Sequence, residues 1–361
     1  MKRGALRATG QVGNLPHVIM KTVKAERRKI PAWLPQVLGY AVSAACLWWV
    51  LRGYDLRQLA TDFRTLDWRW MMLAVVADLL VYVCHGWRWN TLLAPVSRLS
   101  FWRTVQAIYI GLFANEVLPL RPGEVIRCYL LAHWNDLRIS VGFASAALER
   151  IIDGFWLLVA VILVVVRSER PVDPRFEVVI EGMAVLLVIA AAGFLWIIKH
   201  KEHPHAVDHE SRWAAMMRHV TEGLQLMGNA RTLQLTALVS LLYFALQGVT
   251  MWALMKAYSL DYSIWVATGV LTLYRLATVV PNAPGNFGLG NLACFMALRH
   301  FELGAEYAKT FSFLYLAAQT LPLLVGGAIA TALTGLNINE LREQAHRGTM
   351  AAPKAAIEPR V

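Results

Sequence analysis

Cysteine is scarce in this chain, and its few copies lie far apart. The sequence has four cysteines, each in an apolar or amphipathic segment and none in a C-x-x-C pair: Cys46, Cys84, Cys128 and Cys294. A disulfide framework or a structural metal site needs closely spaced cysteines, and that spacing is missing. We therefore expect the four to be small buried hydrophobic residues.

Charged residues are also rare. Only 16% of the 361 residues are charged and 57% are hydrophobic, which is too apolar for one or two soluble domains. The composition predicts an all-α, polytopic integral membrane protein. The net charge of +11 gathers in tails and loops between apolar runs, so it favours anchoring beside anionic lipid, and we expect no nucleic-acid partner.

Enzyme motifs are missing as well. The chain has no acidic D-D-x-x-D motif, no nucleotide-binding loop and no nucleophile set beside a base. We therefore expect no enzymatic activity, no cofactor and no metal. One polar loop, 199–231, carries five histidines without the spacing of a metal site: His200, His203, His205, His209 and His219.

Apolar runs separated by charged loops predict about six full spans and two broken helical hairpins. A span needs about 20 apolar residues, and the run 104–118 is too short to cross comfortably, whereas 264–280 is interrupted. The expected spans are 33–51, 71–93, 141–166, 178–198, 233–255 and 311–333, and the helices after the two breaks are 122–134, with proline at its first position, and 284–300.

Basic residues predict the orientation. The amino tail, 1–31, is basic and expected to be disordered, and the loop 199–231 and the polar tail 337–361 are also basic. Positive residues favour the cytoplasmic side, so both termini are expected to face the cytoplasm, in a bacterial inner membrane. The transmembrane domain, 32–336, is expected to divide into halves at about 32–167 and 178–336.

The same P-x-x-P-G pattern breaks the apolar runs twice, 162 residues apart. Three expected spans separate the breaks, an odd number, so the two hairpins enter from opposite faces. Such an inverted repeat is typical of transporters, whose broken helices line a polar cavity near the midplane. The alternative is a pair of ordinary proline kinks. The breaks are formed by Pro119, Pro122 and Gly123, and by Pro281, Pro284 and Gly285.

Three charged residues lie within the span 141–166. Glu149, Arg150 and Asp153 fall within about 100° of arc on a helix and near the bilayer centre. Each ionised side chain costs about 3 kcal/mol there, so the three must face a partner or a wet groove. A lipid site and a salt-bridge cluster that only locks helices together both fit. Charged neighbours crowd the first break: Glu116, Arg121, Glu124 and Arg127.

Other intramembrane polar residues are weaker candidates. Asp78 and His85 are seven residues apart and share one face of the second span. Arg88 and Trp89 lie near its cytoplasmic end and are expected to be interface anchors. Arg275 precedes the second break, where its planar fork suits a phosphate.

The pattern N-x-x-x-P-x-R-x-G-E-x-x-R that ends at Arg127 resembles the flippase-like membrane region of the lysylphosphatidylglycerol synthase family. The E-R-x-x-D at 149–153 and the P-x-x-P-G-x-x-G at 281–288 agree, and the resemblance covers roughly 33–336. It implies lipid translocation: aminoacylated phosphatidylglycerol in members with a synthase domain, and other lipids, including hopanoid or polyprenyl-linked ones, in stand-alone members. This chain shows no aminoacyl-transfer domain, so synthesis is not expected.

We expect arginines of the site to attract phosphate, and carboxylates to balance them or to bind a cationic group or a proton. Asn291 stands where the family tends to carry glutamate, which argues against a cationic aminoacyl lipid. The expected head-group residues are Asn115, Arg121, Glu124, Arg127, Glu149, Arg150, Asp153, Arg275, Asn282, Asn286 and Asn291, with Asp78 and Glu116 as secondary candidates.

The preferred function is therefore a lipid flippase. Two alternatives remain: a membrane-embedded transferase acting on a lipid-linked phosphate, with Glu149 or Asp153 as base, and a non-catalytic scaffold for a cell-envelope lipid enzyme. The expected partners are membrane lipids, a lipid-biosynthetic enzyme and a second copy of the chain.

Overall fold

A computed structural model of the chain describes residues 64–118, 121–167, 174–199, 212–278 and 286–335, with single positions at 41, 44, 45, 48 and 61. Both tails and most of the expected first span lie outside the described residues. So do five residues of the two breaks: Pro119, Pro281, Asn282, Pro284 and Gly285.

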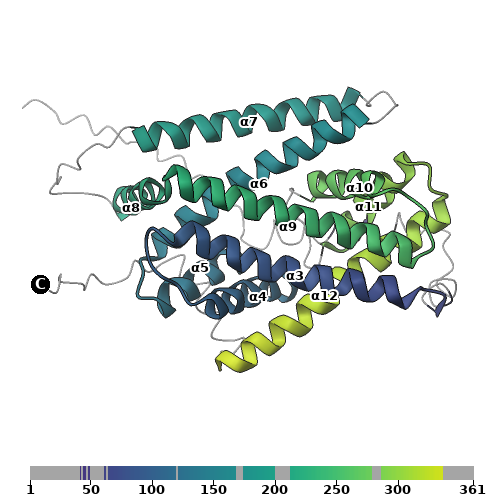
Figure 1. Ribbon diagram of the computed structural model, residues 1–361, viewed down its shortest axis with the longest axis horizontal. Helices are drawn as coiled ribbons and strands as arrows, with labels where there is room; N and C mark the ends of the chain where they lie inside the picture. The colour runs from purple at the N-terminus through teal and green to yellow at the C-terminus, as the bar shows by residue number, and fades with distance from the viewer. Residues whose placement is uncertain are drawn as a thin grey trace, which may run out of the picture.

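The described ranges fold into α-helices joined by short turns, and they contain no strand, which confirms the all-α prediction (Figure 1). The helices are α3 (Trp68–Leu93), α4 (Phe101–Val117), α5 (Gly123–Trp134), α6 (Ile139–Arg167), α7 (Pro174–Lys199), α8 (Arg212–Met227), α9 (Ala230–Ala257), α10 (Ile264–Ala277), α11 (Leu289–His300) and α12 (Ala305–Thr334).

Three of the described helices, α3, α9 and α12, are long and apolar enough to cross a membrane. The outer faces of the long helices expose large apolar side chains such as Met72, Leu186 and Leu238, whereas the interior holds charged groups such as Glu149. A soluble protein has the reverse arrangement. The exposed apolar faces therefore suit contact with lipid, and the polytopic membrane fold is confirmed.

Three differences from the predicted elements go beyond a shift of a few residues at the end of a span. The loop 199–231 contains a helix, α8, because Val220, Leu224 and Met227 share one face and pack into the core beside α6. Pro122 is the N-cap of α5 rather than its first residue, so the helix begins at Gly123, one residue later than expected. After the second break, α11 begins only at Leu289.

The chain repeats one four-helix pattern. The helices α3 to α6 have 26, 17, 12 and 29 residues, and α9 to α12 have 28, 14, 12 and 30. Exchanging the two sets leaves the packing unchanged: α4 packs on α12 as α10 packs on α6, and α5 packs on α6 as α11 packs on α12. Each set also has its own apolar core.

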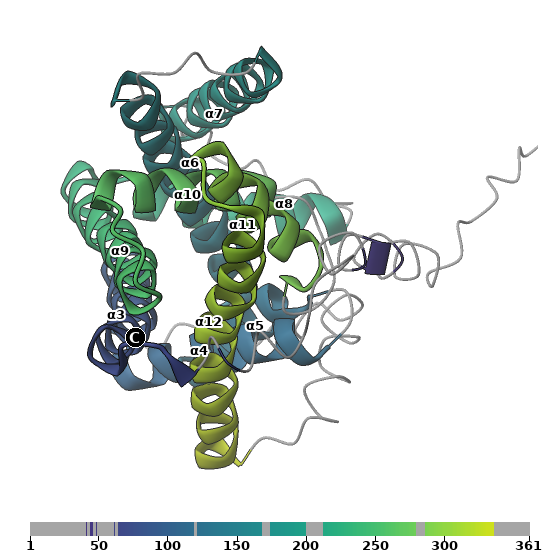
Figure 2. The same cartoon turned by 90° about the vertical axis from the view of Figure 1, so that its right-hand side faces the viewer.

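The two halves are inverted relative to each other. Helices α3 and α9 pack along their lengths, and their contacts run antiparallel: the Asp67 amide donates to the Ala257 carbonyl at 2.9 Å, and the Cys84 thiol donates to the Val239 carbonyl at 3.5 Å. The α4–α5 and α10–α11 hairpins lie toward opposite ends of the molecule in Figure 1. Figure 2 shows the α6–α7 hairpin projecting from the bundle.

Candidate functional site

The hairpin of α4 and α5 is stabilised by Asn115, a residue that the sequence analysis expected to bind the lipid head group. The Asn115 side-chain oxygen accepts a hydrogen bond from the Gly123 amide at 2.7 Å, which supplies a partner for backbone freed at the start of α5. A Cβ on Gly123 would lie 1.8 Å from the Gly111 carbonyl oxygen. The helices therefore approach at a distance that only glycine permits, and Asn115 has a structural role in the hairpin.

The tips of the two hairpins meet. Arg121, directly after the first break, donates from Nη1 to the side-chain oxygen of Asn286 at 2.9 Å. Both residues have a left-handed backbone, with φ of 51° and 55°. Two pieces of chain 165 residues apart thus touch where the inverted halves face each other, and the left-handed conformation is uncommon for the arginine.

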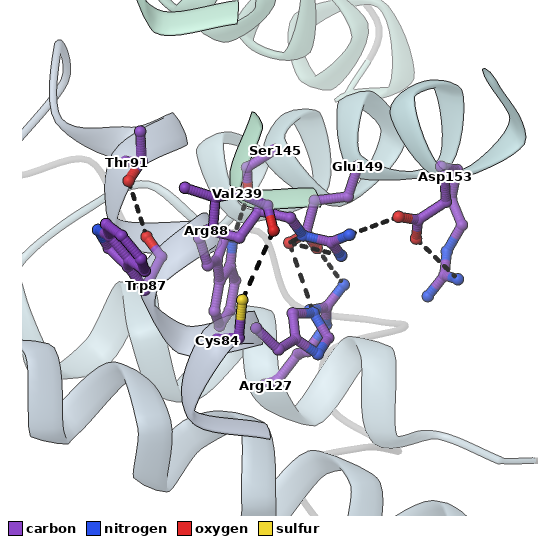
Figure 3. Close-up of polar contacts among 12 residues, drawn as sticks. Cys84, Trp87, Arg88, Thr91, Arg127, Ser145, Glu149, Asp153 and Val239 are labelled. Carbon is purple, nitrogen blue, oxygen red and sulfur yellow. Dashed lines mark hydrogen bonds and ion pairs between the residues drawn. The ribbon is translucent and has the colours of Figure 1, made fainter. Parts of the chain in front are cut away.

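A fully buried carboxylate lies at the centre of the first half. Glu149 on α6 accepts from Arg127 Nη2 at 2.8 Å and from Arg88 Nε at 3.3 Å, and its side chain is 1% exposed. Figure 3 shows both guanidinium groups directed at this carboxylate from separate helices. The ion pairs tie α3 and α5 to α6.

The sequence suggested that Arg88 and Trp89 are interface anchors, but the structure buries both. Arg88 is 1% exposed and forms a second ion pair with Asp153, and its guanidinium lies 4.7 Å from the Tyr243 ring centroid. The Trp89 indole donates to the Ser145 hydroxyl at 2.8 Å. The prediction was wrong because the α6 carboxylates supply buried partners that the sequence of α3 alone does not reveal.

His85 completes the inner part of this network. Its Nε2 lies 3.1 Å from Arg127 Nη1 and 3.5 Å from Glu149 Oε1. A guanidinium can only donate, so the shorter contact requires Nε2 to accept and the imidazole to be neutral. His85 therefore orients Arg127 and leaves the Glu149 charge to the arginines.

The outer rim of the network is more accessible. Glu124 accepts from Arg127 Nε at 2.8 Å and from Arg150 Nη2 at 2.7 Å, and the side chains of Glu124 and Arg150 are 39% and 62% exposed. We name the network the charged cluster. It has three cations and three anions: Arg88, Arg127 and Arg150 with Glu124, Glu149 and Asp153.

Arg275, Asn291, Asp78 and Glu116 lie outside the ion pairs of the charged cluster. Arg275 is bonded from Nη2 to the Gln247 side-chain oxygen, and Asn291 is buried with its side-chain oxygen accepting from the Gly288 amide at 3.2 Å. Asp78 is buried on α3, and Glu116 is half-buried near the end of α4. The structure thus places the candidates in two groups, with Arg121 and Asn286 at the hairpin tips.

Metal ligation has no support in the parts of the chain that the structure describes, where no group of three or more His, Cys, Asp or Glu side chains is placed to hold an ion. His219 lies on α8 beside Arg138 and Glu222, and the other four loop histidines are outside the described ranges. The cysteine expectation is confirmed for Cys84, Cys128 and Cys294, which are free and buried, and Cys46 is not described.

The sequence of the chain matches one family of membrane proteins. The family model for the lysylphosphatidylglycerol synthase TM region matches residues 36–327, which include both hairpins and the charged cluster. The chain belongs to this family. The match confirms the resemblance that the sequence motifs carried.

Two archaeal relatives in the same family are described only as UPF0104 membrane proteins. The one from Methanothermobacter thermautotrophicus is 20% identical over 275 residues, or 70% of this chain and 80% of the relative. The one from Methanocaldococcus jannaschii is 23% identical over 235 residues, or 63% of this chain and 96% of the relative.

The sequence did contain a signal for Arg88, the residue whose role was misassigned. Asp78, His85 and Arg88 recur at spacings of seven and three, so they lie on one face of α3, and all three are buried. Gln247, the partner of Arg275, gave no comparable signal, because a single amide in an apolar helix has many explanations.

Proposed function

We propose that the protein moves lipid head groups between the two leaflets of a cytoplasmic membrane, with both termini on the cytoplasmic side. The acyl or isoprenoid tails stay in the bilayer while the charged head group crosses between the inverted halves. The family is one of membrane proteins, and lipid translocation is the activity that fits this architecture within it.

The observation that carries the proposal is the half-open form of the charged cluster. Arg88, Arg127 and Glu149 are sealed, whereas Glu124 and Arg150 stay accessible beside the broken hairpin. A purely structural cluster gains nothing from an exposed rim of charge in a membrane, where each such group is costly. At such a rim, a head-group phosphate could replace Glu124 as the partner of Arg150, or an amine could replace Arg150 as the partner of Glu124.

A scaffold function is the second candidate, and the sealed part of the cluster favours it. Glu149 and its two arginines satisfy one another, as groups do when they only hold helices together. A scaffold of this kind would hold a lipid-biosynthetic enzyme, and neutralising Glu124 and Arg150 would leave its function intact. The transferase reading has no comparable observation in its favour.

Leaflet exchange by purified protein separates these functions. Vesicles carry phospholipids or a polyprenyl phosphate labelled on the tail, and a membrane-impermeant quencher reports the outer leaflet. We expect wild type to exchange at least one lipid class and Arg150→Ala to slow that exchange about tenfold, because a charged hydrogen bond to the head group is lost.

The matched control is Arg231→Ala, which removes an exposed arginine at the start of α9, outside both groups of candidate residues. It should exchange like wild type. Equal rates in Arg150→Ala and Arg231→Ala would contradict a role of the rim and favour the scaffold.

A further inference from the structure

A second group of polar residues lies between the two halves, and its bonding differs from that of the charged cluster. Counted from the first residue of each helix, Gln247 on α9 occupies the place of His85 on α3, and Tyr315 and Gln319 on α12 occupy the places of Glu149 and Asp153 on α6. The Gln319 amide donates to the Tyr315 hydroxyl at 2.7 Å. The second half thus has neutral residues where the first has carboxylates.

Arg275 is the arginine of this second group. Its guanidinium donates to Gln247, much as Arg127 contacts His85, but within the described residues no carboxylate lies within ion-pair distance of it. Its Nε makes no hydrogen bond there either. In the described residues, the buried Arg275 guanidinium therefore lacks an ion-pair partner, whereas Arg127 pairs with two carboxylates, Glu124 and Glu149.

The buried polar atoms that lack a hydrogen-bond partner differ in type between the two halves of the molecule. In the described part of the chain, the unpaired buried atoms of α3 to α6 are two acceptors, Asp78 Oδ2 and Glu116 Oε2, and the Ser140 hydroxyl. Apart from serine hydroxyls, which can donate or accept, the unpaired atoms of α9 to α11 are donors or a phenol: Gln247 Nε2, Arg275 Nε, Asn291 Nδ2 and the Tyr274 hydroxyl. Apart from hydroxyls, the first half thus leaves acceptors unpaired and the second half leaves donors unpaired.

These atoms belong to one neighbourhood. Tyr82, one turn after Asp78 on α3, donates from its hydroxyl to the Gln319 carbonyl at 3.5 Å, and the Gln319 amide donates to the Tyr315 hydroxyl. The Tyr315 ring lies 5.0 Å from the ring of Tyr274, the residue before Arg275. Glu116 lies five residues before Arg121, which bonds Asn286 of the second half. We name Asp78, Glu116, Gln247, Tyr274 and Arg275 the Arg275 group.

Bound water alone is a poor explanation for unpaired acceptors in one half and unpaired donors in the other. A water molecule donates and accepts, so it serves a mixed lining as well as a segregated one. A segregated lining suits a ligand with separate negative and positive ends, because each end then finds partners of one kind. A guanidinium with amide donors recognises phosphate oxygens, and two carboxylates recognise an ammonium.

We propose that the Arg275 group binds a zwitterionic phospholipid head group, with the phosphate on Arg275 and Gln247 and a single ammonium on Asp78 and Glu116. The inference rests on the proposed function, for which it names the substrate class. The bound head group spans both halves, whereas the charged cluster lies within the first half.

The test uses full-length protein in phosphatidylglycerol vesicles with a tail-labelled trace of phosphatidylethanolamine or of its N-acetyl derivative. N-acetylation removes the ammonium and keeps the phosphate. We expect wild type to exchange phosphatidylethanolamine about tenfold faster than the N-acetyl lipid, since a charged hydrogen bond is lost. Equal rates overturn the inference and leave the proposed function intact.

Two variants separate the ends of the head group. Asp78→Asn should slow phosphatidylethanolamine to the rate of the N-acetyl lipid, and Arg275→Gln should slow both. Asp261→Asn, an exposed carboxylate in the loop after α9, is the matched control and should behave as wild type. A preference for the amine that survives in a folded Asp78→Asn protein overturns the assignment of Asp78.

A binding measurement decides the inference even if no lipid exchanges. Short-chain phosphatidylethanolamine should raise the unfolding temperature of detergent-solubilised wild type more than its N-acetyl form does, because a ligand that binds the native state stabilises it. Asp78→Asn should abolish the difference. Equal shifts in wild type mean that water fills the site, and they overturn the inference.

Discussion

At the residue scale, Glu149 decides how the first half is held together. Burying a charge is tolerable only when opposite charges satisfy it, and Arg88 and Arg127 do so from two other helices. Removing the carboxylate would leave two guanidinium groups with less compensation in the interior. Arg150 differs, because its side chain is 62% exposed and its ion pair with Glu124 is partly open.

Glu149→Gln should therefore lower the free energy of unfolding by about 3 kcal/mol, the scale for breaking a buried pair by removing one partner. Arg150→Ala on the same helix should lower it by less than about 1 kcal/mol, as expected for exposed pairs. Denaturant unfolding in detergent measures both. If Arg150→Ala lowered the free energy of unfolding more than Glu149→Gln, the conclusion that Glu149 is the buried, stabilising charge would be wrong.

The sequence predicted part of this network from the cost of charge in a membrane. That cost singled out the three α6 charges and their neighbours Glu124 and Arg127, which do meet them. It could not identify Arg88, because an arginine near a helix end either extends to the interface or pairs inward, and only the packing of α3 on the other helices decides between the two.

At the element scale, the broken hairpins depend on close approach of backbone. Gly123 at the start of α5 lies against Gly111 of α4, and neither position has room for a side chain without displacing its neighbour. The break itself was predictable from proline and glycine. The start of α11 at Leu289 was not, because the turn through Asn286 and Gly288 depends on contacts with the opposite hairpin.

Gly123→Ala should destabilise the protein by about 3 kcal/mol, since the added Cβ would overlap the Gly111 carbonyl and force the hairpin apart. Gly193→Ala on α7 is the control, because no atom lies within 4 Å of its added Cβ, and it should be neutral or slightly stabilising. Thermal unfolding followed by circular dichroism measures both. Similar unfolding temperatures for the two variants would refute the close approach of α4 and α5.

At the scale of the whole molecule, two inverted halves share one packing plan and differ in their polar residues. The first half has a self-compensated cluster of six charges, and the second has Arg275, which hydrogen-bonds a neutral amide. Sequence alone predicted the inverted repeat from the two P-x-x-P-G breaks and the odd number of spans. It did not predict the contrast between the halves, because that requires pairing α3 with α9 and α6 with α12 residue by residue.

The central claim is that a lipid head group crosses between these halves unchanged. The most direct measurement follows leaflet exchange and lipid mass together, in vesicles of natural phospholipids with and without wild-type protein. The account predicts that the protein speeds exchange of at least one lipid while every lipid keeps its mass. A changed lipid mass, or no exchange of any lipid by protein that unfolds cooperatively, would contradict it.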